Sequence, residues 1–292
     1  MNEVMSIGGQ TANIKYKDGC DGTFHVFNSF DINSRPRKIE IFLPLGYENS
    51  KDKYPVIYMN DGQTAFEPGG LSPWYWNVEE TLNKFYKEKI ISKVIVVAIS
   101  PINRVDEYLS IKQYLDFDNS VVDIAGGLPK YAKYLASELK PFIDSNYRTD
   151  PNPARTMIVG SSFGGTASFY ISCTHPKAFG VAGVFSPSFT IGTGLQINPQ
   201  PIEKTEYIQG ILTSLHGSKT KPTLWIDWGE QEGDTGTRSL EVIKLLKEKE
   251  SYKENENIFY MEDKMGTHDE RAWAYRFGLL MKQFYGNLAG EF

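Results

Sequence analysis

The sequence Gly160-Ser161-Ser162-Phe163-Gly164-Gly165 is the strongest indication of the fold, because it follows the apolar run 157–159 and precedes a helical pattern over 166–173. A serine between a buried strand and a helix, with glycines two residues before and after it, is typical of a nucleophile elbow. The glycines avoid clashes in the strained turn, and the first N–H groups of the helix point toward charge that develops on a bound carbonyl oxygen. We therefore predict Ser162 as a nucleophile and the N–H of Phe163 as an oxyanion donor.

Composition narrows the class of protein. The chain has 292 residues, of which 40% are hydrophobic, and no internal repeat or low-complexity linker, so we expect one domain over 1–292. Its formal net charge of −5 argues against nucleic acid or an anionic membrane surface as a partner, and no apolar run approaches the ~18 residues of a membrane span. Residues 1–10 lack the features of a signal peptide and the two cysteines do not form a disulfide framework, so we expect a cytoplasmic protein.

Hydrophobic patterning predicts the order of elements along the chain. Turn residues separate three segments within residues 1–45, which predicts N-terminal antiparallel strands at 12–17, 22–28 and 38–43. Six continuous apolar runs follow, as expected for strands buried on both faces of a parallel sheet: 55–59, 94–99, 157–159, 181–185, 223–226 and 258–261. Helical spacing over 131–142 and 273–284 completes the pattern of a doubly wound α/β fold with a mostly parallel sheet.

Two long segments, 101–128 and 187–222, lack clear periodicity. Loops of this length in a compact domain are usually functional. We expect the second segment, 187–222, to form a lip that binds substrate.

A serine nucleophile needs a general base, and four histidines are present. His25 lies far upstream, His175 ends the helix after the serine, and His216 precedes the expected acid loop. His268 directly follows the last predicted strand, which is the position of the base when the chain order is serine, acid, histidine. We therefore predict His268 as the base.

The acid is expected after the strand 223–226, where four carboxylates compete. Asp227 lies at the edge of the strand and is expected to brace a loop. Spacing alone does not separate Glu230, Glu232 and Asp234, so all three remain open at this point.

The oxyanion hole needs a second N–H donor, from the loop after an earlier strand of the sheet. The strand 55–59 ends in the sequence Asn60-Asp61-Gly62-Gln63. The backbone N–H of Gln63 is our candidate, although Asp-Gly is also a common turn dipeptide.

Together these blocks resemble the putative esterase family of α/β-hydrolases, which includes enterochelin-esterase-like proteins, family 1 carbohydrate esterases and the antigen 85 mycolyltransferases. The resemblance covers residues 38–286 through six ordered blocks: 54–63, Arg104 with Glu107-Tyr108, 139–144, 160–165, 185–189 and 268–273. It implies an α/β-hydrolase fold, with Ser162 as nucleophile and His268 as base. It also places the acid on Glu232, through the pattern Gly-x-x-Glu, and the second oxyanion donor on Gln63.

Two departures from the family pattern concern the substrate. Thr190 stands where the family often has a tryptophan, and the segment 191–221 is long. Both lie where the acyl or alcohol group would be held. The resemblance therefore does not carry a substrate over from any one relative.

Three further residues are candidates for substrate binding: Asp61, Trp76 and Arg104. The run Trp74-Tyr75-Trp76 would either stack on a sugar or phenolic ring or pack in the core. Arg104, together with Glu107, would bind a polar group of the substrate or form an ion pair that braces a loop. No cysteine/histidine cluster or Walker-type loop is present, so we expect no metal, nucleotide or other cofactor.

The leading hypothesis is a cofactor-free serine carboxylesterase. Its substrate would be a small-molecule ester, such as an acylated sugar, a phenolic ester or a siderophore-type ester. An acyltransferase would use the same acyl-enzyme with an alcohol in place of water. A non-catalytic binding protein on this fold would lack the serine, histidine or acid, and all three are present.

Overall fold

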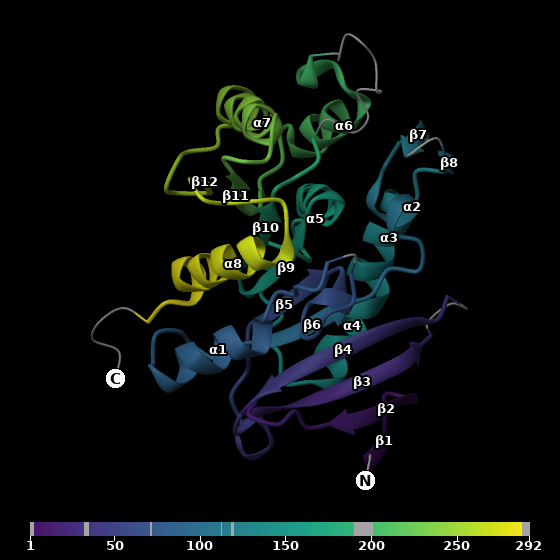
Figure 1. Ribbon diagram of the computed structural model, residues 1–292, viewed down its shortest axis with the longest axis vertical. Helices are drawn as coiled ribbons and strands as arrows, with labels where there is room; N and C mark the ends of the chain where they lie inside the picture. Colours follow the sequence, from purple (N-terminus) through teal and green to yellow (C-terminus); the bar gives the residue numbers. More distant parts are fainter. Residues whose placement is uncertain are drawn as a thin grey trace.

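A ten-stranded mixed sheet runs through the computed structural model, which describes residues 3–31, 35–70, 72–111, 113–117, 120–189 and 201–287 (Figure 1). In spatial order its strands are β1 (Glu3–Ile7), β2 (Gln10–Lys15), β3 (Gly22–Phe30), β4 (Arg37–Pro44), β6 (Ile95–Ile99), β5 (Val56–Asn60), β9 (Thr156–Ser161), β10 (Val181–Phe185), β11 (Thr223–Gly229) and β12 (Ile258–Asp263). Pairing is antiparallel from β1 to β6 and parallel from β6 to β12. The predicted α/β fold, with antiparallel N-terminal strands beside a parallel sheet, is confirmed.

Helices and short turns connect these strands. The α-helices are α1 (Val78–Lys87), α2 (Arg104–Tyr108), α3 (Leu128–Tyr134), α4 (Lys140–Asn146), α5 (Phe163–Thr174), α6 (Glu206–Leu215), α7 (Thr235–Glu250) and α8 (Glu270–Tyr285). Short 3₁₀ helices are η1 (Tyr47–Asn49), η2 (Gly62–Thr64), η4 (Pro153–Arg155) and η5 (Ile202–Lys204), and η3 (Leu135–Leu139) is a π-helix. A separate hairpin consists of β7 (Gln113–Phe117) and β8 (Ser120–Ile124).

The central strands are apolar throughout because helices cover both faces of the sheet. In β5, Val56 and Tyr58 belong to the core that includes residues of α3, α5 and α6. Their neighbours Ile57 and Met59 point the other way, into the core formed with α1 and α8. Because successive side chains of a strand alternate between faces, burial on both sides requires a continuous apolar run.

The N-terminal strand β1 differs from the central strands, because it is exposed along most of its length. An exposed strand carries no apolar pattern, and the sequence did not predict β1.

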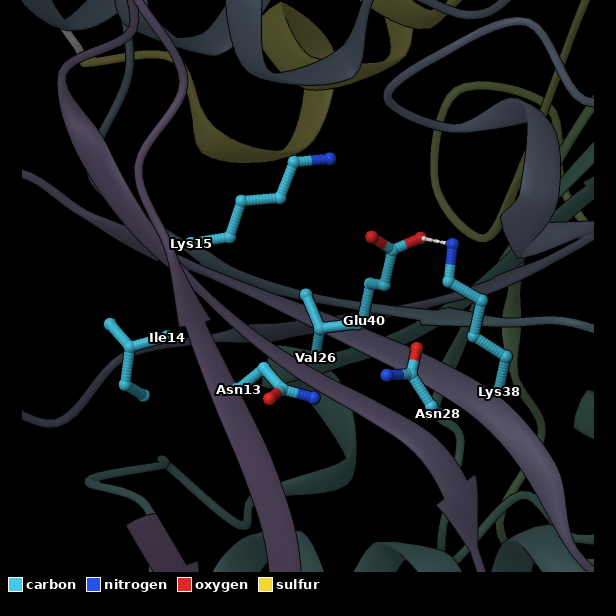
Figure 2. A pocket seen from close by; sticks show the side chains of 7 residues that line it. All are labelled: Asn13, Ile14, Lys15, Val26, Asn28, Lys38 and Glu40. Atoms are coloured by element: carbon cyan, nitrogen blue, oxygen red, sulfur yellow. Dashed lines mark ion pairs between the residues drawn. The ribbon is translucent and has the colours of Figure 1, made fainter. Parts of the chain in front are cut away.

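A polar groove of about 390 Å³ crosses the face of β2, β3 and β4. Figure 2 shows its lining residues, and Lys38 Nζ is paired to Glu40 Oε2 at 2.7 Å. This groove lies on strands at the other end of the sheet from β11 and β12.

Both segments without clear periodicity contain regular structure. The segment 101–128 includes α2 and the hairpin of β7 and β8. In the segment expected as a substrate lip, 187–222, residues 190–200 lie outside the described part of the chain. The expectation of a loop is wrong for α6 in that same segment, because Tyr207, Ile208 and Ile211 are buried in the core and Tyr207 Oη donates to Thr166 O at 2.6 Å.

The parallel strands bring distant parts of the sequence to one edge of the sheet. Residues that follow β5, β9, β11 and β12 all lie at the carboxyl ends of these strands, where open α/β sheets hold their ligands. Among the residues described, no helix combines the length and apolar character needed to cross a bilayer.

Candidate active site

The turn between β9 and α5 holds Ser162 in a strained backbone conformation. Its φ of 56° and ψ of −124° lie outside the regions that non-glycine residues normally occupy. The glycines make the turn possible, because a Cβ on Gly160 would lie 2.5 Å from Gly164 O, and one on Gly165 would lie 2.6 Å from Phe185 O. Ser161, by contrast, is buried as the last residue of β9. This is the geometry expected of a nucleophile elbow at Ser162.

Two backbone N–H groups lie at helix starts beside this turn. Phe163 is the first residue of α5, and Gln63 lies in η2, directly after β5. The first N–H groups of a helix have no acceptor within the helix, so they are available to an oxyanion. Because β5 and β9 are parallel neighbours, both helix starts lie at the same edge of the sheet.

His268 lies between β12 and α8 and contacts one of the three competing carboxylates. Its Nδ1 is 3.0 Å from Glu232 Oε2, and the Glu232 side chain is only 1% exposed. Glu230 is 54% exposed beside Lys264, and Asp234 is 65% exposed beside Arg238. The structure therefore brings together the histidine and the acid that the resemblance implies.

Several donors surround the Glu232 carboxylate. Its Oε1 accepts hydrogen bonds from Gly229 N at 2.7 Å, Ser186 Oγ at 2.8 Å and the Arg276 guanidinium at 3.2 and 3.3 Å. Burial works to raise the pKa of Glu232, but the hydrogen bonds from His268 and Ser186, together with the Arg276 cation, hold it below its usual value. The carboxylate is thus kept ionised beside the imidazole.

The sequence did not predict Ser186, Trp273 or Arg276 as residues of the site. Ser186 Oγ accepts hydrogen bonds from Trp273 Nε1 at 2.8 Å and Arg276 Nη2 at 2.7 Å. The Trp273 ring packs edge-on against His268, with 5.2 Å between ring centroids. A signal for Arg276 exists in the sequence, because it lies on the apolar face of a predicted helix, between Trp273 and Leu280.

Ser186 also links the serine turn to the acid loop. The residue before it, Phe185, accepts a hydrogen bond from Ser162 N at 3.0 Å through its carbonyl oxygen. Ser186 N in turn donates to Asp227 O at 2.8 Å. One short segment at the end of β10 therefore contacts both halves of the candidate site.

Asp227 lies in β11, fully buried. Burial raises its pKa to about 7, and the Arg276 guanidinium and a hydrogen bond from Trp225 Nε1 only partly offset this. Its side chain contacts Trp225 and Arg276, and its interpretation as a brace stays a prediction.

The remaining substrate-binding candidates have different surroundings. Asp61 and Arg104 form a bidentate ion pair, with both N–O distances 2.8 Å, and the half-buried guanidinium lies 5.3 Å from the centroid of the Phe163 ring. Trp76 is only 1% exposed and packs against Phe185 and Trp273, so its ring faces the core rather than a binding surface. Glu107 pairs with Arg37 instead of Arg104, at 2.8 Å.

The other three histidines lie in different surroundings. His25 Nδ1 is 3.1 Å from Tyr147 Oη, and burial lowers the pKa of His25 to about 4. His175 contacts Thr174 at the end of α5, and His216 lies 3.7 Å from Glu250. Within the described ranges, no three histidine, cysteine, aspartate or glutamate side chains group as metal ligands.

Comparisons with known proteins agree with this architecture. The family model described as "Putative esterase" matches residues 31–280. The chain is 22% identical over 255 residues to the uncharacterized protein YbbA of Bacillus subtilis (strain 168), which covers 86% of this chain and 91% of that protein. Its fold is similar to that of the siderophore hydrolase EstA from Aspergillus nidulans, with a TM-score of 0.66 at 16% identity over 93% of this chain and 97% of that one.

A second solved structure with a similar fold is the enterobactin esterase FES from Shigella flexneri. Its TM-score is 0.63 at 16% identity, over 91% of this chain and 59% of that one. At these identities the structural likenesses establish the fold, and the family match spans most of the chain. The chain therefore belongs to the putative esterase family and is a carboxylic ester hydrolase of the α/β-hydrolase fold.

Proposed function

We propose that this esterase works through an acyl-enzyme on Ser162, with His268 as general base and Glu232 as the acid that orients it. The observation that carries the proposal is the 3.0 Å contact between His268 Nδ1 and the buried Glu232 carboxylate, in the loops at the sheet edge that also holds the strained serine turn. A base held by a third group beside a serine elbow is the arrangement that acyl transfer requires.

In the first half-reaction, Ser162 Oγ bonds to the carbonyl carbon of the ester and passes its proton to His268 Nε2. The carbonyl π electrons move to the oxygen, which the N–H groups of Gln63 and Phe163 stabilise. Glu232 stabilises the imidazolium. Collapse of this intermediate breaks the bond to the leaving alcohol, which takes the proton from His268. Water then repeats these steps on the acyl-enzyme and releases the acid.

The substrate we propose is an ester of a hydroxylated aromatic acid. Solved structures with similar folds are named ferulic acid esterase, siderophore hydrolase and enterobactin esterase. In this chain, Arg104 is a half-buried cation beside Phe163, and its bidentate pair with Asp61 fixes its position. A guanidinium there would donate to the phenolic oxygens of such an acyl group.

A panel of esters tests both parts of this proposal. Feruloyl, dihydroxybenzoyl, acetyl-sugar and short-chain aryl esters are compared at equal concentration, with Ser162→Ala as the blank. We expect the highest kcat/KM on the hydroxylated aromatic acyl groups, and Arg104→Met to lower kcat/KM for these more than for the acetyl esters. Equal rates in the Ser162→Ala blank would contradict the mechanism, and a preference for acetyl-sugars would contradict the substrate class.

A further inference from the structure

The two oxygens of the Glu232 carboxylate have different surroundings. Oε2 faces the His268 ring at 3.0 Å. Oε1 accepts hydrogen bonds from a backbone N–H, a hydroxyl and both terminal nitrogens of Arg276. One oxygen is therefore anchored on several sides, and the other is left to face the imidazole.

Arg276 is fully buried on α8 between two carboxylates. Its terminal nitrogens donate to Glu232 and to Ser186. Its Nε lies 3.1 Å from Asp227 Oδ1, within ion-pair distance but without the alignment of a hydrogen bond. The guanidinium thus donates its hydrogen bonds to Glu232 and Ser186, whereas its contact with Asp227 is an ion pair without a hydrogen bond.

Two glycines make room for this arrangement. A Cβ on Gly266 would lie 2.8 Å from Arg276 Nη1, and one on Gly229 would lie 2.7 Å from Glu232 Oε1 and 2.3 Å from Gly266 O. Any larger residue at either position would push the guanidinium or the carboxylate away. The loops after β11 and β12 are therefore built around the contact between Arg276 and Glu232.

We infer that Arg276 is a positioning residue for the acid of the triad: it keeps Glu232 ionised and fixes Oε1, so that Oε2 faces His268. This inference rests on the proposed function, because it requires Glu232 to orient the imidazole. A buried carboxylate without a cation tends to take up a proton. A lysine would supply a point charge without the planar fork that contacts Glu232 through two nitrogens.

Loss of the cation is also expected to change the pH profile, because Arg276 lies within a group of titratable side chains. Asp227 in β11 and Glu232 contact the guanidinium directly, Asp263 at the end of β12 interacts with Asp227, and His268 contacts Glu232. Removal of the cation favours protonation of Glu232, and a protonated Glu232 no longer stabilises the imidazolium that forms during catalysis. The acidic limb of the kcat/KM profile therefore moves to higher pH.

The experiment compares Arg276→Met and Arg276→Lys in the wild-type and Glu232→Gln backgrounds. In the wild type we expect Arg276→Met to lower kcat on the order of 10- to 100-fold, the size of effect that misplacement of a catalytic group produces. We expect little change in KM, an acidic limb at higher pH and only partial recovery with lysine. In the Glu232→Gln background the same substitution should change kcat by less than about threefold, since residues that act as one unit are not additive.

Control variants distinguish an effect of Arg276 on the position of Glu232 from a general loss of folding. Lys140→Met removes another buried cation, paired with Asp144 on α4, and should leave kcat and the pH profile unchanged. If Arg276→Met does not fold, the same measurements are made on the double variant Arg276→Met/Asp227→Asn. In this variant the carboxylate of Asp227, which would otherwise be left without its ion-pair partner, is also removed. Equal losses of kcat in both backgrounds, or an unmoved acidic limb, would overturn the inference. Full activity of Ser162→Ala would instead overturn the proposed function itself.

Discussion

The serine turn and the acid loop reach the same sheet edge by different means. Ser162 lies in a turn whose shape depends mainly on neighbours in sequence, because Gly160 and Gly164 pack closely on each other, with one further hydrogen bond from Ser162 N to Phe185 O. Glu232 is held by distant side chains, from Ser186 after β10 and Arg276 on α8. Local geometry leaves a short motif in the sequence, whereas a network of distant contacts does not. We therefore expect variants of the two regions to lose activity and stability in different ways.

The largest effect is expected at Ser162, the proposed nucleophile. Ser162→Ala removes the attacking atom and leaves only binding and oxyanion stabilisation, so kcat should fall on the order of 10⁴- to 10⁶-fold. Steady-state kinetics on a soluble aryl ester measure this, with Ser161→Ala as the matched control at the adjacent, buried hydroxyl. A loss confined to Ser161→Ala would place the nucleophile one residue earlier.

The next largest effect is expected at Glu232, the proposed acid. Glu232→Gln keeps the size of the side chain but removes the charge that stabilises the imidazolium, so kcat should fall roughly 10²- to 10⁴-fold with little change in Tm. Glu230→Gln and Asp234→Asn are matched controls in the same exposed loop and should be nearly silent. If Asp234→Asn were crippled and Glu232→Gln were not, the acid would lie two residues downstream.

A change at the serine turn should affect stability as well as activity. In Gly160→Ala the new Cβ would meet the backbone of Gly164 at 2.5 to 3.0 Å, and backbone cannot move aside as a side-chain tip can. We expect a loss of about 1–3 kcal/mol in the free energy of unfolding. Urea denaturation measures it. Gly210→Ala on α6, where nothing lies within 4 Å of the new Cβ, should instead gain roughly 0.5–1 kcal/mol.

The acid side should also make stability depend on pH, which the uncharged serine turn cannot do. The pKa of Asp227 is raised from 3.8 to about 7 in the folded protein. The folded state therefore binds this proton more tightly than the unfolded state, and the stability it contributes is present below pH 3.8 and lost as pH rises through 7. Asp227→Asn should have a smaller drop in Tm between pH 5 and 8 than wild type. If the drop in Tm were the same in Asp227→Asn and wild type, a group other than Asp227 would bind the proton.

The same contrast explains what could be predicted from the sequence. The buried strands and the serine turn each have a recognisable local sequence pattern. The continuous apolar run from Val56 to Met59, for example, directly predicts a strand that is buried on both faces. The strand β1 could not be predicted, because it is exposed, and α6 was missed although Tyr207, Ile211 and Leu215 recur at helical spacing.

For the candidate site, chain order alone was enough to propose His268, whereas spacing left three carboxylates open. Glu232 was reached through the family resemblance, and the structure adds its contact with His268. Ser186 and Arg276 contact the site through hydrogen bonds that join the residue after β10, the acid loop and α8. Such contacts join residues up to 90 positions apart, so no local pattern contains them.

Covalent labelling of the folded protein with an organophosphonate reports directly on whether Ser162 is an activated nucleophile, as an acyl-enzyme on this residue requires. The probe bonds to an activated serine and loses its leaving group, so intact mass spectrometry counts the adducts and peptide mass spectrometry locates them. We expect one adduct, on Ser162, and slow labelling of the His268→Ala variant. An adduct on Ser161, or none on the folded wild-type protein, would contradict it.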